Sequence, residues 1–487
     1  FSHGTFSIKR VAYYLYLTDA GIFGTPLGVS ASFVYLFILF GAILNKTGAG
    51  KFFIDFATAL TGYTRGGPAK AAVVSSGMMG TISGSSTANT VTTGSFTIPL
   101  MKSIGYSSVF AGAVEPVAST GGQIMPPIMG AAAFIMAEFL GVPYIEIAKA
   151  AIFPALFYYF ALFMAVDFKA AKIGLRGLSR EQLPNLLKTL KTGWILLAPI
   201  FALIYLLVQG YSPQKSVVLS IVVLIIVSMF SKKTRLTPKK LLEAITEAGV
   251  SATTVAVACA AAGIIVGITT MSGLGLKFTG IVFEVSRGIL PIALILASLA
   301  SLVLGMGVPT TANYIIMATL IAPALIRLMP ENTHLILPHM FVFYYGILAD
   351  ITPPVMLAVF AGAAIARAPA MKVGIQSTKL AIPGYTLPFM FVFHPELISW
   401  NFTPDLNLAK LGFFLLLATA MSVGIAGGMQ GYLIRETKFY ERMMLLAGSF
   451  MIIPANYMVN LLGLALIGIT LLSQILLKKQ KVRVLEE

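Results

Sequence analysis

Six long stretches of this sequence contain no charged side chain. They are residues 20–45, 71–101, 248–276, 288–326, 411–434 and 443–477. A helix that spans a bilayer needs about 20 mostly apolar residues, and each of these stretches is longer than that. Only 11% of the 487 residues are charged and 57% are hydrophobic. A soluble multidomain enzyme and a disordered chain both need more polar surface. The sequence therefore predicts an all-α, polytopic membrane protein.

The basic residues lie between the hydrophobic stretches. The 34 Lys and Arg exceed the 18 Asp and Glu by 16, and they concentrate in residues 46–70, 167–193 and 231–240. Short loops rich in Lys and Arg face the cytoplasm. We therefore place these three segments inside the cell, with turns 138–146 and 209–215 outside. This placement argues against nucleic acid as a partner, and the single Cys259 excludes a disulfide framework within the chain.

Two halves of the chain repeat an ordered set of motifs. The matched segments are 85–89 with 309–313, 98–99 with 322–323, and 122–127 with 349–354. Amphipathic stretches, 51–62 and 239–249, open the two halves. The charge pattern gives the halves opposite orientations, so we predict an inverted repeat. Inverted repeats with interrupted helices are typical of secondary transporters, which bind substrate and ions near the midplane of the membrane.

Each half contains a predicted re-entrant hairpin, about 70–102 and about 288–328. Thirteen of the 23 residues from 75 to 97 are Ser, Thr or Asn, and glycines interrupt them. This composition favours a break, and non-helical backbone at membrane depth must be buried in protein or line a cavity. We expect turns at 83–89 and 305–311. The alternative is that Gly80 and Gly84 simply let helices pack closely.

A pair of prolines follows each hairpin. Pro126-Pro127 and Pro353-Pro354 each remove backbone donors and free carbonyl groups. We therefore predict two Pro-broken helices, about 107–138 and about 335–366. Carbonyl and hydroxyl oxygens suit a hard cation such as Na⁺. An ordinary proline kink is the alternative.

Asp350 and Glu115 are the acids expected to lie within spans, where ionisable residues are functional candidates by default. Asp350 aligns with Gln123 of the other half. Asp350 is expected either to balance a bound cation or titrate, or to cap a helix or pair with a Lys. For Glu115 an interfacial position near the cytoplasmic mouth is the alternative to a functional one.

The sequence contains no constellation that predicts an enzyme. It has no GxxxxGK[ST] loop for ATP phosphates, and its four His residues lack the spacing of metal ligands. We therefore expect no catalytic residues and no cofactor apart from a coupling ion.

Segments 77–89 and 305–314 resemble the two hairpins of the large membrane subunit of TRAP (tripartite ATP-independent periplasmic) transporters. Segments 119–127 and 349–354 resemble the broken helices of that family. The resemblance extends from about residue 21 to 372. The residues of these motifs, and the hydrophobic region after residue 383, look most like the fused TAXI-type branch of the family. In that branch a small membrane subunit precedes the large one in a single chain.

The resemblance implies an ion-transporter-type fold with elevator-type transport and scaffold domains. It implies import of organic acids (carboxylates) across the bacterial inner membrane by symport with Na⁺ or H⁺. The implied partners are a periplasmic substrate-binding protein of TAXI type and an N-terminally fused small membrane subunit. The implied divisions are 1–26 (connection from a missing small-subunit part), 27–193 (first repeat), 194–230 (linking spans), 231–372 (second repeat) and 373–487 (extra C-terminal helices).

The resemblance also assigns site residues. The family's first sodium site maps onto Ser83, Ser85, Gly122, Met125 and Pro127. A second ion site would lie around Gly305, Thr310, Thr311 and Thr352. Asp350, singled out above as an acid within a span, is a further candidate ion ligand. The candidate substrate ligands are the hydroxyls of both turns and nearby amides, namely Ser86, Thr87, Asn89, Gln123, Thr311 and Asn313.

Two other functions stay open on the sequence alone. A stand-alone Na⁺/dicarboxylate symporter also uses Ser/Thr/Asn hairpins but needs no binding protein. An ion channel would not need two gated hairpins of opposite orientation. For the region after residue 383 the sequence suggests only added scaffold area or contact with a partner, and 443–477 is short for two crossings.

Overall fold

The computed structural model describes residues 6–231, 234–400 and 407–486. Within these residues it contains 24 α-helices and no β-strand, so the all-α prediction is confirmed. Five described helices are long and apolar enough to span a membrane, or up to eight if each of three bent pairs is one span. The five are Thr25–Lys46, Tyr144–Lys172, Pro238–Ser272, Leu408–Gln430 and Tyr457–Leu477.

The first half begins with a short exposed helix and one long span, followed by shorter helices. A π-helical segment, η1 (Ser30–Val34), joins α2 to α3 without a break. The helices are α1 (Ile8–Leu17), α2 (Thr25–Val29), α3 (Tyr35–Lys46), α4 (Ala49–Thr61), α5 (Gly67–Ser83), α6 (Ser86–Ser103), α7 (Ser108–Gly122), α8 (Ala131–Leu140) and α9 (Tyr144–Lys172).

The second half has the same order of helices. After the long span that opens each half, first residues of corresponding helices lie from 223 positions apart (Gly67 and Leu290) to 228 positions apart (Ser108 and Ile336). The helices are α13 (Pro238–Ser272), α14 (Leu274–Ser286), α15 (Leu290–Gly305), α16 (Thr310–Leu320), α17 (Ala322–Leu328), α18 (Ile336–Leu348), the 3₁₀ turn η4 (Ala349–Ile351), α19 (Leu357–Ala366) and α20 (Ala370–Phe393).

The amphipathic stretch that opens the second half is part of a longer helix. Residues 239–249 form the first turns of the continuous helix α13. No helix stop interrupts α13 until Gly273, whose left-handed backbone (φ 67°) suits glycine and ends it. The short helix that corresponds to α4 is therefore α14, and the two begin at Ala49 and Leu274.

The remaining helices link the two halves or follow the second one. They are η2 (Arg180–Gln182), α10 (Leu186–Gly193), η3 (Trp194–Leu196), α11 (Ala198–Val208), α12 (Pro213–Ser228), α21 (Glu396–Ser399), α22 (Leu408–Gln430), α23 (Phe439–Met451) and α24 (Tyr457–Glu486). The stretch 443–477 is interrupted at Pro454, because α23 ends at Met451 and α24 begins at Tyr457.

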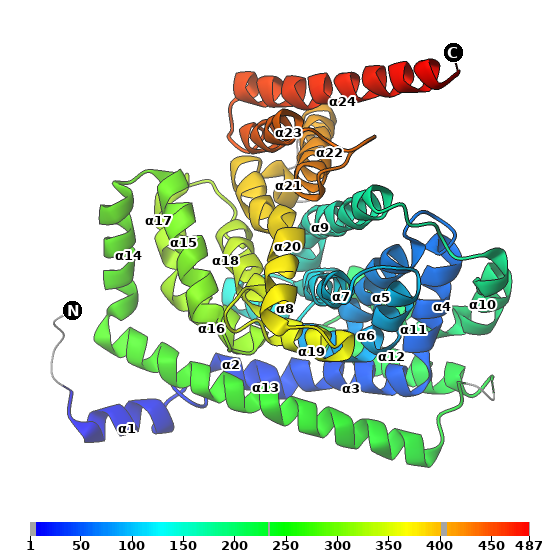
Figure 1. Ribbon diagram of the computed structural model, residues 1–487. Coiled ribbons are helices and arrows are strands. Elements are labelled where there is room, and N and C mark those ends of the chain that lie inside the picture. Colours follow the sequence, from blue (N-terminus) through cyan, green and yellow to red (C-terminus); the bar gives the residue numbers. More distant parts are fainter. Residues whose placement is uncertain (1–5, 232–233, 401–406, 487) are drawn as a thin grey trace.

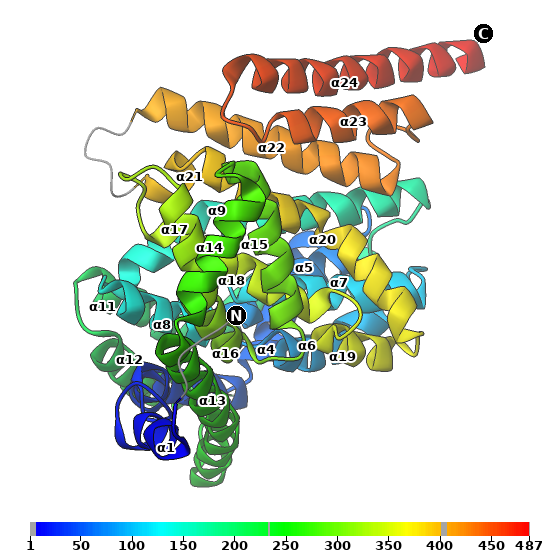
Figure 2. The same cartoon turned by 90° about the vertical axis from the view of Figure 1, so that its left-hand side faces the viewer.

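The helices form three layers. Figure 1 shows α3 and the long α13 along the bottom, α22 to α24 along the top, and the two sets of short helices between them. Figure 2, turned by 90°, keeps α13 at the bottom and α22 to α24 at the top. The short, interrupted helices therefore lie in the middle layer, where protein covers them on both sides.

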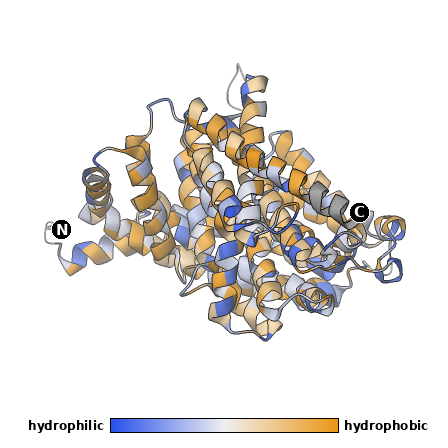
Figure 3. Cartoon of the chain, turned by 45° about the horizontal axis from the view of Figure 1, so that its top comes forward, coloured by the Kyte–Doolittle hydropathy of each residue, from blue (hydrophilic) through white to orange (hydrophobic). Residues whose placement is uncertain are grey.

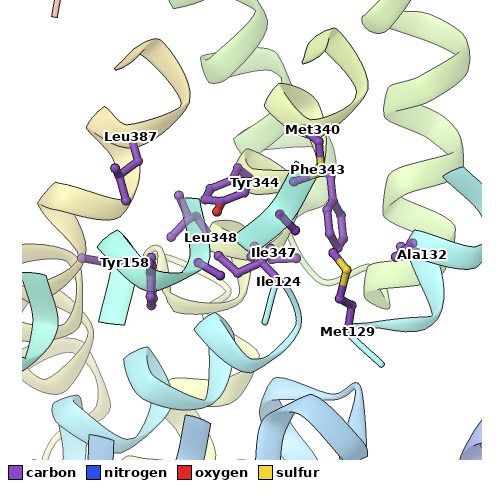
Figure 4. Close-up of a cluster of buried hydrophobic side chains, with 14 of the residues drawn as sticks. Ile124, Met129, Ala132, Tyr158, Met340, Phe343, Tyr344, Ile347, Leu348 and Leu387 are labelled. Carbon is purple, nitrogen blue, oxygen red and sulfur yellow. The ribbon is translucent and has the colours of Figure 1, made fainter. Parts of the chain in front are cut away.

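A buried core holds the two proline segments together. Ile124 and Met129, on either side of the first proline pair, pack near Phe343, Tyr344 and Ile347 of α18 (Figure 4). All five side chains are at most 2% exposed. Close packing of this kind fixes the positions of the side chains, because even a small change of side-chain volume costs free energy. The broken helices of the two halves thus share one core.

Large apolar side chains cover the outside of the molecule. Figure 3 shows hydrophobic residues on the outer faces of many helices. Phe201 and Val257 are each 64% exposed, and Leu461 is 52% exposed. Soluble monomers rarely expose such continuous apolar surface. Together with the long apolar helices, this surface makes the protein a multi-pass membrane protein.

Candidate functional site

The first hairpin has a very short turn. Helix α5 ends at Ser83, and Gly84 has a left-handed backbone (φ 63°) that glycine adopts without strain. The Ser85 hydroxyl then caps α6 by accepting a hydrogen bond from the Ala88 N–H at 3.3 Å. The break therefore spans Gly84 and Ser85 only. The expected turn over 83–89 was too wide, because the cap restarts the helix at Ser86.

The second hairpin has a wider turn. Helix α15 ends at Gly305, and α16 begins at Thr310 directly after Pro309. Gly307 in the intervening loop has a left-handed backbone (φ 77°). Backbone groups of this loop are free of helical hydrogen bonding over a longer stretch than in the first hairpin. The two turns are therefore alike in position and different in length.

Both proline pairs interrupt their helices. Helix α7 ends at Gly122 and α8 begins at Ala131. In the second half α18 and η4 end at Ile351, and α19 begins at Leu357. The Pro126-Pro127 and Pro353-Pro354 bonds are cis. The carbonyl oxygen of Pro127 lies 3.0 Å from the Tyr144 hydroxyl.

Two asparagines of the hairpins donate hydrogen bonds to backbone carbonyl groups of neighbouring helices. Asn89 Nδ2 donates to the Ser76 carbonyl oxygen at 2.8 Å, across the first hairpin. Asn313 Nδ2 donates to the Gly346 carbonyl oxygen at 2.8 Å, from the second hairpin to α18. Both side chains are at most 1% exposed. The equivalent asparagines of the two motifs therefore hold helices in contact.

A cavity of about 540 Å³ lies between the hairpin turns and helices α3 and α13. Its wall contains the candidates Ser83, Ser85, Ser86, Thr87, Thr310, Thr311 and Asp350. The other candidates lie outside this wall: Asn89, Gly122, Gln123, Met125, Pro127, Gly305, Asn313 and Thr352. Among the described side chains, the charged residues of the wall are Asp350 and Glu247, with no Lys or Arg. The structure thus brings both hairpin turns to one cavity, whose wall combines these polar residues with apolar ones such as Phe37 and Phe134.

Asp350 connects the two halves at this cavity. Its Oδ2 atom accepts a hydrogen bond from Ser86 Oγ at 2.7 Å. Asp350 is 8% exposed and Ser86 is 2% exposed. The partner of Asp350 is therefore a hydroxyl of the opposite half, and the expected alternatives of a Lys partner or a helix cap do not describe it.

Several buried oxygens near the turns have no hydrogen-bond partner. In the described part of the chain they include Ser83 Oγ, Asn89 Oδ1, Thr120 Oγ1, Gln123 Oε1, Ser301 Oγ and Asn313 Oδ1. A buried polar atom without a partner costs free energy, so such atoms mark places where an ion or water completes the structure. Most of them belong to the two hairpins or to the segment before the first proline pair.

Thr120 and Ser301 were not among the sequence candidates. Thr120 lies in the Ser/Thr/Gly segment that precedes the first proline pair, so its position in the motif was a usable signal. Ser301 lies in the apolar helix α15, where nothing in the sequence distinguishes it. Its unpartnered hydroxyl became visible only in the structure.

Two candidates, Thr352 and Glu115, are hydrogen-bonded to other groups of the protein. Thr352 Oγ1 donates to the Leu348 carbonyl oxygen at 2.7 Å and lies 2.5 Å from the Tyr385 hydroxyl of α20. Glu115 is 0% exposed and contacts the hydroxyls of Thr93 and Thr97. Glu115 of α7 is therefore buried against α6 within the protein.

The described residues contain no group of three or more His, Cys, Asp or Glu side chains placed to hold a metal ion. The unpartnered hydroxyl and amide oxygens near the turns are neutral oxygen atoms.

The fold and the site define a multi-pass membrane protein with a cavity at the turns of two helical hairpins. The model of the family "Tripartite ATP-independent periplasmic transporter, DctM component" matches residues 4–406. The chain therefore belongs to this family, the TRAP transporter large component, which is a family of transporter permeases and not of enzymes.

Individual relatives match shorter stretches. A Haemophilus influenzae protein named as a TRAP transporter large permease is 28% identical over 195 residues, 40% of this chain and 45% of its own length. The C4-dicarboxylate TRAP transporter large permease protein DctM of Vibrio cholerae is 38% identical over 125 residues, 26% of either chain. This chain thus spans less than half the length of these two curated relatives. An uncharacterized protein, y4mL of Sinorhizobium fredii, is 23% identical over 377 residues, 76% of this chain and 85% of its own length.

Proposed function

We propose that this protein is the membrane permease of a binding-protein-dependent secondary transporter that imports organic acids by cation symport. The observation that carries the proposal is the cavity lined by both hairpin turns and Asp350. The family supports transport as the activity, and the name of the Vibrio cholerae relative supports C4-dicarboxylates as the first substrates to test.

The substrate carboxylate would bind at the starts of α6 and α16. Ser86 and Thr87 open α6, and Thr310 and Thr311 open α16. Helix N-termini offer free N–H groups and a positive dipole end, which favour an anion. Because no Lys or Arg lines the cavity, these backbone groups and the coupling cations would supply the positive charge.

The coupling ion would be Na⁺, with H⁺ as the second possibility through Asp350. Ser83 Oγ, Asn89 Oδ1 and Thr120 Oγ1 are buried oxygens without partners in the first half, and Asn313 Oδ1 is one in the second half. Hard cations take oxygen ligands of this kind. We assign one ion site to each half on this basis.

Transport would follow an elevator mechanism built on an inverted repeat. The moving group would comprise α5 to α9 and α15 to α20, which include both hairpins and both proline pairs. The fixed group would comprise α2, α3 and α11 to α13. The cavity lies at their boundary, because its wall combines α3 and α13 with the hairpin turns.

We propose the partners and the site of action by analogy with the family. A periplasmic substrate-binding protein of TAXI type would deliver the substrate, and a small membrane subunit fused ahead of residue 26 would complete the fixed group. The site of action would be the bacterial inner membrane. The hydrophobic helices after residue 383 support the TAXI-type assignment.

Uptake by proteoliposomes tests this function. The full chain, reconstituted with a candidate binding protein, is offered radiolabelled succinate or fumarate under an inward Na⁺ gradient, a proton gradient, or neither. We expect saturable uptake that needs the binding protein and the Na⁺ gradient. Equal uptake without the binding protein would favour a stand-alone symporter, and flux that does not saturate would favour a channel. Uptake that follows only the proton gradient would contradict the sodium assignment.

A further inference from the structure

The C-terminal helices α22, α23 and α24 have no role in the proposed function. Residues from 407 onward lie beyond the stretch 4–406 that the family model matches. The sequence suggested only added scaffold area or a contact with a partner. Figures 1 and 2 show these helices on the side of the middle layer opposite to α3 and α13.

We propose that α22 to α24 form one rigid unit that moves with the hairpin-bearing group during transport. This inference rests on the elevator mechanism proposed above. It requires that the unit be rigid, that it be attached firmly to the moving group, and that it be separate from the fixed group.

A buried polar cluster makes the unit rigid. Glu441 of α23 is 0% exposed. Its carboxylate accepts hydrogen bonds from Arg435 Nη2 at 2.6 Å, Ser473 Oγ at 3.1 Å and Gln474 Nε2 at 2.9 Å. Ser473 and Gln474 lie on α24, and Arg435 lies in the turn between α22 and α23. The cluster therefore ties α23, α24 and the turn that follows α22 to one charged group, which is costly to bury without these partners.

Close packing supports the same conclusion. A Cβ atom built on Gly463 of α24 would lie 2.6 Å from the carbonyl oxygen of Gly448 of α23. Asn460 Nδ2 donates to the Ile452 carbonyl oxygen at 2.6 Å and to the Pro454 carbonyl oxygen at 2.9 Å. Helices α23 and α24 are thus in backbone contact, and the bend between them is held by a side chain.

The unit is attached to the moving group at both ends of α22. Near the first end, the ring of His394, directly after α20, lies 4.5 Å from that of Phe414. Lys410 Nζ lies 2.5 Å from Glu396 Oε1 of α21, a short helix that itself packs against α9 of the moving group. Near the second end, Lys172 Nζ of α9 donates to the Gln430 carbonyl oxygen at 3.3 Å. Between these points α22 packs along α9. A helix held at both ends cannot swing on its own.

The fixed group lies elsewhere. In the described residues, the helices outside the unit against which α22 packs extensively are α9, α20 and α21. The helix α13 packs instead against α3 and α16. A unit that stayed still in the membrane would have to slide along α9 and break the contacts at both ends of α22. A unit that moves with α9 keeps all of them.

Distances between paired spin labels test the inference. The labels are placed on cysteines at exposed positions: Val257 of α13 (64% exposed), Leu156 of α9 (50%) and Leu461 of α24 (52%). The full chain carries Cys259→Ala, which removes the one natural cysteine. Each pair is measured in proteoliposomes in NaCl, in KCl, and with the gradient that drives uptake. Uptake by each unlabelled double-cysteine variant must match that of the Cys259→Ala parent.

We expect the Val257–Leu156 and Val257–Leu461 distances to change together, and the Leu156–Leu461 distance to stay constant. A changing Val257–Leu156 distance with a constant Val257–Leu461 distance would overturn the inference and leave the elevator intact. A constant Val257–Leu156 distance under all conditions would overturn the elevator, and with it the inference. The two failures are therefore distinguishable.

Discussion

Ser86 and Asp350 are 264 positions apart in the sequence and 2.7 Å apart in the structure. Ser86 opens α6 of the first hairpin, and Asp350 lies in η4, the 3₁₀ turn directly before the break in the second half. The corresponding position in the first half carries Gln123, whose side-chain amide has no partner. The site is therefore asymmetric, because the second half contributes an acid where the first half contributes a neutral amide.

Replacing this charge tests the role of Asp350 in coupling. Asp350→Asn keeps an oxygen for the Ser86 hydroxyl but removes the negative charge. A hydrogen bond to a charged group contributes about 1.5–3 kcal/mol, and about 1.4 kcal/mol corresponds to tenfold in rate. We therefore expect ion-coupled uptake to fall at least about tenfold while the protein still folds. Initial uptake rates at several Na⁺ concentrations measure this.

Two serine variants of the first hairpin accompany Asp350→Asn. Ser85→Ala tests the site, and Ser95→Ala is its control. Ser85 lines the cavity and caps α6, so its loss should also lower uptake. Ser95 is exposed on the same helix, and its hydroxyl bonds only the Thr92 carbonyl oxygen among the described contacts. Uptake should be unchanged in Ser95→Ala. Wild-type uptake and sodium dependence in both Asp350→Asn and Ser85→Ala would refute the site assignment.

The contact between Gly80 and Gly122 leaves no room for a side chain. A Cβ atom on Gly122 would lie 2.4 Å from the Cα atom of Gly80, and backbone atoms cannot move aside as a flexible side chain can. Overpacking of this kind costs about 1–3 kcal/mol. We expect Gly122→Ala to lower the midpoint of thermal unfolding in detergent. Gly249→Ala is the control, because nothing lies within 4 Å of its Cβ position; an equal loss in both variants would show that the contact is not the cause.

The parts of this fold that follow local chemistry were predictable. Ser85 predicts a helix start and Pro126-Pro127 a helix break, because capping and the missing proline N–H act within a few residues. The lateral contacts were not predictable from the chain. Nothing near Thr352 indicates that it faces Tyr385, and nothing near Gln430 indicates that its carbonyl group faces Lys172. Such contacts join segments far apart in sequence, so only the folded chain specifies them.

The site was predictable in its residue types and less so in its division of roles. Thr87 lines the cavity as expected for a substrate ligand. Asn89 was also assigned to the substrate, yet it lies behind the cavity wall with its Nδ2 bonded to the Ser76 carbonyl oxygen. The two residues are neighbours in one motif. Helical geometry separates them, because positions two apart point to different sides of a helix.

This separation predicts different kinetic effects for the two residues. Thr87→Ala should raise the substrate concentration for half-maximal uptake about tenfold or less, because one neutral hydrogen bond contributes about 0.5–1.5 kcal/mol. Asn89→Ala should instead raise the Na⁺ concentration for half-maximal uptake, because it removes the unpartnered oxygen Oδ1. Uptake titrated separately with substrate and with Na⁺ distinguishes them. A change of substrate dependence alone in Asn89→Ala would place this residue in the substrate site.

The buried carboxylate of Glu441 should dominate the stability of the C-terminal unit. Glu441→Ala removes one partner of a buried ion pair and leaves the Arg435 guanidinium without its carboxylate. Breaking such a pair costs about 3–5 kcal/mol. Thermal unfolding of the full chain in detergent, with proteolysis sites mapped by mass spectrometry, should show early cleavage between residues 430 and 477. Glu436→Gln is the control, because Glu436 is exposed in the same turn and surface changes are usually within about 0.5 kcal/mol. If Glu441→Ala unfolds at the wild-type temperature and resists cleavage there, the cluster does not hold the three helices together.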